Sequence, residues 1–114
     1  DFLFTTYTHI FPDQSPYLVS GVLINTETIS VAYDTLTSFS DININNIPNY
    51  YFDDCDDVIG YDWKTYSLST NEYSINSSKS YIIRRYKDYF KLRFIDFYND
   101  SGDKGYPKFE FQKL

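Results

Sequence analysis

The chain has 114 residues, a formal net charge of −6, 13 tyrosines, 10 phenylalanines, one histidine and one cysteine. One core usually serves about 100–150 residues, so we expect a single domain over residues 1–114. The acidic balance argues against nucleic acid as a partner, because proteins that bind a phosphate backbone present a basic face. No run of about 18 apolar residues occurs, so we expect no transmembrane segment.

The composition favours β-structure, because tyrosine, phenylalanine and β-branched residues fit a pleated, half-buried surface. It predicts an all-β domain of about eight or more short, mostly antiparallel strands in a sandwich-like arrangement, with at most one short helical turn near residues 37–42. We expect hairpins between residues 17–25 and 28–34, and between residues 72–76 and 77–87. The other expected strands are residues 2–11, 61–68, 88–98 and 106–114.

The last stretch, "YFKLRFIDFYNDSGDKGYPKFEFQKL", contains two aromatic strands around a polar, glycine-containing loop. Alternation places its apolar side chains on one face, which we expect to be buried. Within residues 17–25, Gly21 indicates a bulge or the close approach of another group to the backbone. The residues of the closing hairpin predicted to lie in the core are Phe90, Leu92, Phe94, Phe109 and Phe111.

The inventory of reactive residues argues against an enzyme. His9 is the only histidine, so a Ser–His–acid or Cys–His arrangement would need it. Cys55 lies in the run "FDDCDDVIG", where aspartates should raise the thiol pKa, the opposite of what a nucleophile needs. The same aspartates could offer oxygen ligands to calcium, but their spacing lacks the EF-hand pattern, so a solvated acidic loop is favoured.

His9 shares one face of the first strand with Tyr7 and Phe11. A lone strand histidine is most often a satisfied polar residue, yet imidazole is also a common ligand of haem iron. Tyrosine phenolate can ligate ferric iron as well, which adds Tyr7 and Tyr33 as undistinguished candidates. His9 is therefore the best candidate for a metal ligand.

Half of the chain's ten basic residues lie within "YIIRRYKDYFKLR". A positive strip of this kind could bind a carboxylate or another anion. We favour the interpretation that these residues pair across strands with the many aspartates. They are Arg84, Arg85, Lys87, Lys91 and Arg93.

The stretch "KSYIIRR…DYFKLRFIDFYNDSGDKGYPKFEFQKL" resembles the closing segment of the HmuY family of bacterial haem-binding proteins. The resemblance rests on a Tyr-hydrophobic-Ile-Arg strand, a "YFKLRF" strand, a "GDKGYP" loop and a final "FEFQKL". Upstream, "DFLFTTYTHIF", "YLVSGVLIN" and "VIGYDWKTYSL" fall in the expected order, so the resemblance covers essentially all of the chain. Because the sequence starts directly in a strand without an initiator Met, we interpret it as an HmuY-like domain trimmed at its amino end.

This resemblance implies an exported protein, lipid-anchored or shed at the outer membrane of Bacteroidetes-type bacteria. Such haemophore-like proteins capture haem and pass it to an outer-membrane transporter. In the family, two axial side chains from the amino-terminal half, usually two His or two Met, hold the haem iron. This sequence has one His and no Met. Three arrangements stay open: five-coordinate haem on His9, haem on His9 with Tyr33, or the binding of another porphyrin or a different ligand.

Arg84 or Arg85 would then be a partner for haem propionates, because a guanidinium fork engages both carboxylate oxygens. The resulting hypothesis is a non-enzymatic haem- or porphyrin-binding protein for haem acquisition at the cell surface. The alternative is a surface module that binds a glycan or a protein partner through exposed tyrosines and Trp63, without haem.

Overall fold

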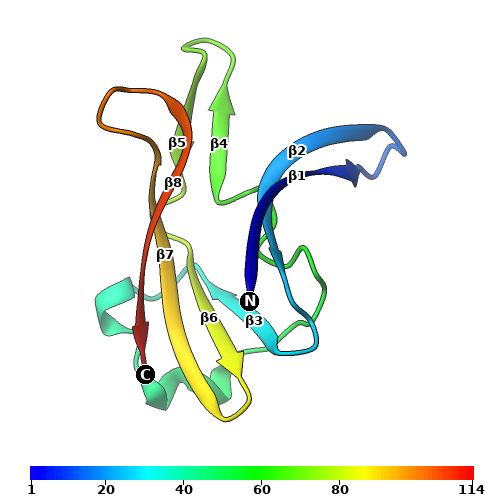
Figure 1. Cartoon of the computed structure of the whole chain (residues 1–114). Coiled ribbons are helices and arrows are strands. Elements are labelled where there is room, and N and C mark those ends of the chain that lie inside the picture. The colour runs from blue at the N-terminus through cyan, green and yellow to red at the C-terminus, as the bar shows by residue number, and fades with distance from the viewer.

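The computed structural model describes the backbone of residues 1–114 and every side chain in that range except that of Tyr17. Eight strands form three antiparallel sheets (Figure 1), which confirms the predicted all-β fold. The strands are β1 (Phe2–Ile10), β2 (Pro16–Ile24), β3 (Ile29–Asp34), β4 (Lys64–Ser67), β5 (Glu72–Ile75), β6 (Ser80–Arg85), β7 (Asp88–Tyr98) and β8 (Lys104–Lys113).

The largest sheet has the strand order β3-β6-β7-β8, and its last two strands form the predicted closing hairpin. Alternate residues of β6 face opposite sides of this sheet. Tyr81 and Ile83 join the main core on one face, whereas Ile82 packs with Ala32 and Ile42 on the other. Burial on both faces explains why the three consecutive residues 81–83 are all apolar.

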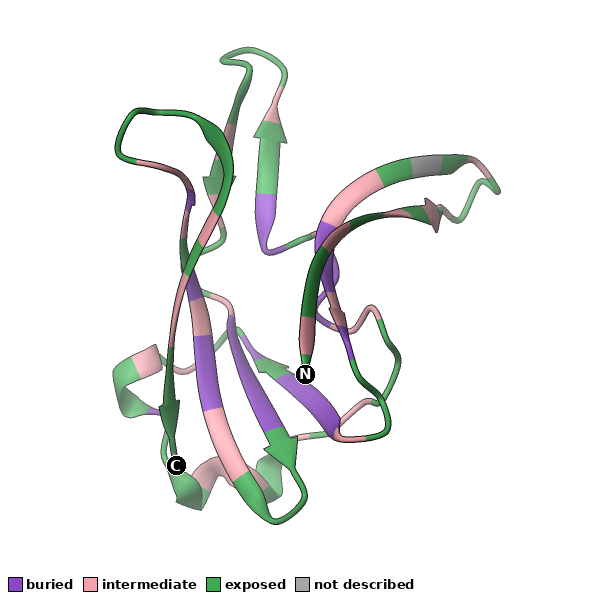
Figure 2. Ribbon diagram, viewed as in Figure 1, coloured by how far each residue is buried: buried purple, intermediate pink, exposed green. Residues whose placement is uncertain are grey.

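The buried residues lie along the middle of this sheet and at the base of β2 and β4 (Figure 2). Of the predicted core residues, Leu92 and Phe94 are buried, and Phe90 and Phe109 are half-buried against the same core. The prediction is wrong for Phe111, whose side chain is 64% exposed. It lies on β8, an edge strand, and borders an open pocket, so no further element covers it.

Two predicted hairpins are wrong. Strand β2 pairs with β1 and β3 pairs with β6, while β5 pairs with β4. The segment between β2 and β3 does not return the chain alongside β2; within it the carbonyl of Asn25 accepts hydrogen bonds from the N–H groups of Thr28 and Ile29. This compact turn directs the chain into the large sheet. After β1, by contrast, Gln14 adopts a left-handed φ of 68° and donates to the carbonyl of Phe11, which reverses the chain into β2.

The β1–β2 hairpin is joined to the rest of the fold by the backbone of Gly60. The N–H of Val22 donates to the Gly60 carbonyl at 2.9 Å, and the N–H of Gly60 donates back to Val22 at 3.1 Å. Gly21 lies directly beside this bridge, so close that a side chain there would meet the Gly60 backbone. The expected close approach at Gly21 is therefore confirmed.

Two short 3-10 turns lie between β3 and β4. The first, Phe39–Asp41, is the predicted helical turn. The second, Ile44–Asn49, was not expected, although Asn43 and Asn46 form a reciprocal cap three residues apart that is a known start signal. No helix in the part of the chain that the structure describes is long and apolar enough to cross a membrane.

Candidate functional site

A groove of about 490 Å³ lies between the β1–β2 and β4–β5 hairpins, which stand apart above one end of the large sheet (Figure 1). Strand β2 contributes aliphatic side chains, and the β4–β5 hairpin with the segment before it contributes tyrosine rings. Two of these rings, Tyr66 and Tyr73, pack at 5.0 Å between centroids. The groove residues are Thr6, Leu18, Val19, Ser20, Tyr61, Asp62, Lys64, Thr65, Tyr66 and Tyr73.

Lys64 forms part of the groove wall although only 7% of the residue is exposed. Its Nζ donates to the carbonyl oxygen of Ser20 and, at 3.4 Å, to that of Tyr61. Burial lowers the pKa of Lys64 from 10.5 to about 8, against the opposing effect of the Asp62 carboxylate. At neutral pH the amine is still mostly protonated. Three aromatic rings surround Nζ at 4.8 to 5.7 Å, namely Trp63, Tyr73 and Phe97.

His9 lies beside the groove, against one of its residues. Its ring centroid is 5.1 Å from that of Tyr61, a groove residue, and 4.7 Å from that of Phe11. Its Nδ1 lies 3.9 Å from Oδ2 of Asp57, and 27% of the side chain is exposed. Metal-binding histidines usually direct one ring nitrogen to a carboxylate, and the other nitrogen then donates its lone pair. Asp57 lies on the Nδ1 side, as this arrangement requires, but 3.9 Å is too long for a hydrogen bond.

Tyr7 lies on the same face of β1 as His9, as predicted, but its hydroxyl is buried. Among the described residues the hydroxyl has no hydrogen-bond partner. Burial, and secondly the charge of Asp57, raise the pKa of Tyr7 to about 12. Both effects disfavour the phenolate that would ligate iron, so Tyr7 is poorly suited to ligation.

Tyr33 lies on β3, in a different sheet from His9, and 59% of it is exposed. The ammonium of Lys79 sits 4.6 Å from its ring centroid and also pairs with the carboxylate of Asp62 at 3.3 Å. Because Asp62 lines the groove, Tyr33 is linked to the groove through Lys79. The contacts of the described side chains do not join Tyr33 to His9.

Arg84 and Arg85 are neighbours on β6, so their side chains point to opposite faces of the sheet. Arg84 donates to Ser30 at 3.1 Å and stacks on the ring of Phe52. Arg85 donates to Asp1 at 2.8 Å. Neither arginine lines the groove beside His9. The structure does not bring the predicted propionate partners together with the predicted iron ligand.

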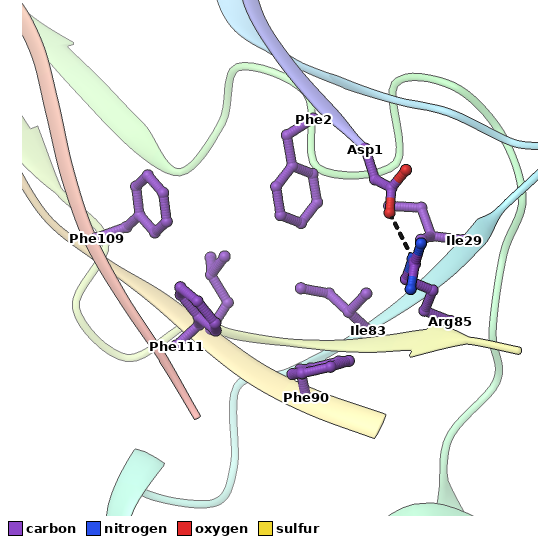
Figure 3. A pocket seen from close by; sticks show the side chains of 9 residues that line it. Asp1, Phe2, Ile29, Ile83, Arg85, Phe90, Phe109 and Phe111 are labelled. Carbon is purple, nitrogen blue, oxygen red and sulfur yellow. Dashed lines mark hydrogen bonds and ion pairs between the residues drawn. The ribbon is translucent and has the colours of Figure 1, made fainter. Parts of the chain in front are cut away.

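Arg85 instead borders a second pocket, of about 290 Å³, between the start of β1 and the large sheet (Figure 3). Phenylalanine rings and aliphatic side chains make up most of its wall, and the Arg85–Asp1 pair lies at one side. Neither this pocket nor the groove has an imidazole in its wall, but His9 packs against Tyr61 of the groove and against no residue of this pocket in the contacts described. This pocket is therefore the poorer match to a site for a metal-containing ligand.

Two further residues of the basic strip, Arg93 and Lys91, have structural partners. Arg93 pairs with Glu110 directly across the β7–β8 ladder, in agreement with the favoured interpretation. Lys91 is buried and donates to the carbonyls of Phe39, at 2.6 Å, and Ile42, at 3.0 Å. It therefore ties the first 3-10 turn to the sheet.

The acidic segment around Cys55 offers no separate site. A hydrogen bond with Asp53 is the main cause that raises the pKa of the Cys55 thiol, as predicted from the flanking aspartates. The His, Cys, Asp and Glu residues that the structure describes do not gather into any group of three or more that could hold a metal ion.

The sequence interpretation missed the residues that wall the groove, above all Lys64 and Tyr61. The available signal was the stretch "YDWKTY", in which a lysine stands among aromatic residues at the start of a strand. Trp63, which the alternative hypothesis required to be exposed, is only 2% exposed and belongs to the core. That part of the alternative is wrong, because the indole packs against Phe94 and Phe97 of β7.

Comparisons with known proteins agree with this architecture. A family model described as HmuY protein matches residues 12–111. A crystal structure of a candidate HmuY-like haem-binding protein from Bacteroides vulgatus is similar to the chain, with a TM-score of 0.50 and 15% identity, and the match covers 96% of this chain and 88% of that one. At this identity the likeness shows the fold alone. None of the curated proteins matches the chain in sequence.

Proposed function

The chain belongs to the HmuY family, and from this premise we propose that it is a non-enzymatic protein that binds haem or a related porphyrin in the groove between the β1–β2 and β4–β5 hairpins. The observation that carries the proposal is the tyrosine-walled groove with a histidine packed against it. A flat aromatic macrocycle binds best where rings and aliphatic side chains cover its faces. A groove of about 490 Å³ lies within the range of small-molecule sites, about 300–1,000 Å³.

Within this proposal His9 is the iron ligand and Asp57 its orienting partner. Bound haem supplies a ferric or ferrous iron that accepts an imidazole lone pair. The carboxylate of Asp57 lies 3.9 Å from Nδ1, and a hydrogen bond formed there when the ligand binds would favour the tautomer in which Nε2 carries that lone pair. Since Tyr33 lies on another sheet, we propose five-coordinate iron on His9 alone.

We also propose a cellular location for the protein. We expect the protein to work at the outer membrane of Bacteroidetes-type bacteria, lipid-anchored or shed, and to pass haem to an outer-membrane transporter. This expectation rests on the family resemblance. Detection of the protein in outer-membrane vesicles or culture supernatant, and labelling by a lipid precursor, would test it.

Haemin titration of the wild-type chain, followed at the Soret band, is expected to saturate and to give the spectrum of an imidazole-ligated iron. His9→Ala should weaken binding by at least about tenfold and abolish that spectrum, because the axial bond is lost. Tyr33→Phe is the matched control and should leave both unchanged. A wild-type chain without any Soret change would refute haem binding, and an unaltered His9→Ala spectrum would refute the ligand assignment.

A glycan-binding module is the second candidate, and Tyr66, 44% exposed at the groove edge, is the observation that favours it. Exposed tyrosine rings can stack on sugar faces. Such a site would not depend on His9. Binding to a glycan array that survives His9→Ala and disappears in Tyr66→Ala would therefore favour this function over haem.

A further inference from the structure

Lys64 is a buried cation without a counter-ion. Only 7% of it is exposed, yet no carboxylate of the described side chains forms an ion pair with it. Its Nζ donates to the carbonyls of Ser20 and Tyr61 and lies close to three aromatic rings. Taking an ammonium out of water costs several kcal/mol, which neutral acceptors offset only in part.

The carboxylate nearest in the sequence, that of Asp62, stabilises the ammonium electrostatically but forms no ion pair with it. Asp62 lines the groove with Lys64, but its carboxylate pairs with the ammonium of Lys79 at 3.3 Å. The groove therefore keeps one unpaired positive charge on a chain whose net charge is −6.

Lys91 provides a useful contrast. It is as deeply buried as Lys64, at 4% exposure, but its two acceptors are the carbonyls of Phe39 and Ile42 around a 3-10 turn. Its role is to close that turn, and it lines none of the described pockets. Lys64, by comparison, lines the largest of these pockets.

We propose that the Lys64 ammonium binds a carboxylate of the ligand in the groove, so that the site selects porphyrins with free acid side chains over neutral ones. The inference rests on the proposed function and adds to it the feature of the ligand that is recognised. For haem the carboxylate is a propionate. Lys64 thus takes the role that the sequence suggested for Arg84 or Arg85, neither of which lines the groove.

The test uses metal-free protoporphyrin IX and its dimethyl ester, followed by porphyrin fluorescence, so that iron ligation plays no part. Wild type should bind the free acid about tenfold or more tightly than the ester, the size expected for a hydrogen bond to a charged group. Lys64→Met should lose this preference, and Lys64→Arg should retain part of it. Lys113→Met is the control: it removes an exposed lysine that does not line the groove, and it should behave as wild type.

The outcomes separate the two claims. If wild type binds neither porphyrin, the proposed function fails. If it binds acid and ester equally, or if Lys64→Met keeps the wild-type preference, the role of Lys64 fails and porphyrin binding stands. Should Lys64→Met not fold, the side-chain resonance of Lys64 in lysine-labelled wild type decides the matter. It should shift with the acid and stay in place with the ester, and equal shifts would overturn the inference.

Discussion

Replacing Gly21 by alanine is expected to lower the free energy of unfolding by about 3 kcal/mol, the upper end for overpacking a close contact. The new Cβ would lie 2.5 Å from the carbonyl oxygen and 2.7 Å from the carbonyl carbon of Gly60. That carbonyl cannot move away easily, because it accepts hydrogen bonds from the N–H of Val22 and from Nε1 of Trp63. Urea denaturation followed by tryptophan fluorescence measures the loss.

Gly102→Ala is the matched control for this substitution. Gly102 has a positive φ of 82° but no atom within 4 Å of the added Cβ, so only backbone strain of about 1–2 kcal/mol is expected. A Gly21→Ala variant no less stable than Gly102→Ala would contradict the close packing of β2 on Gly60. It would also remove the anchor that we assign to the β1–β2 side of the groove.

Trp63→Ala should cost about 3–5 kcal/mol of unfolding free energy, as large aromatic truncations in a core do. The indole stacks on Phe94 at 4.2 Å between centroids, and its Nε1 donates to the carbonyl of Gly60 at 3.1 Å. Circular dichroism during thermal and urea unfolding measures the effect without relying on tryptophan emission.

Trp63→Phe separates packing from hydrogen bonding. It preserves an aromatic contact with Phe94, and the Gly60 carbonyl keeps its bond from Val22, so a loss of about 1 kcal/mol for the hydrogen bond is expected, with a further loss for the smaller ring. If Trp63→Ala were nearly neutral, the indole would have to be exposed. The glycan hypothesis that uses Trp63 would then regain its basis.

Local patterns predicted the strands well, because alternation is a property of neighbouring residues. Residues 88–98 are both the predicted and the observed limits of β7. Which strands pair is decided elsewhere: the compact turn at Asn25 sends the chain from one sheet to another, and its sequence resembles an ordinary hairpin loop. The pairings of β2 and β5 were therefore beyond local reasoning, whereas the closing β7–β8 hairpin was not.

The candidate site, like the strand pairing, could be predicted from the sequence only in part. His9 could be named from the sequence because it is the only histidine. The aromatic neighbours of Lys64 in the sequence were a signal, but its burial could not be predicted, since it depends on Tyr73 of β5, Phe97 of β7 and the carbonyl of Ser20 in β2. Only the folded arrangement brings these segments around one amine.

Paramagnetic broadening by bound haemin in ¹⁵N-labelled protein, referenced to the diamagnetic zinc porphyrin, tests the central claim most directly. The account predicts that the amide signals of His9 and Tyr61 are lost first, because the iron is bound to His9 at the side of the groove where Tyr61 lies. Loss centred instead on Phe90 and Phe111, around the apolar pocket beside Arg85, would contradict it.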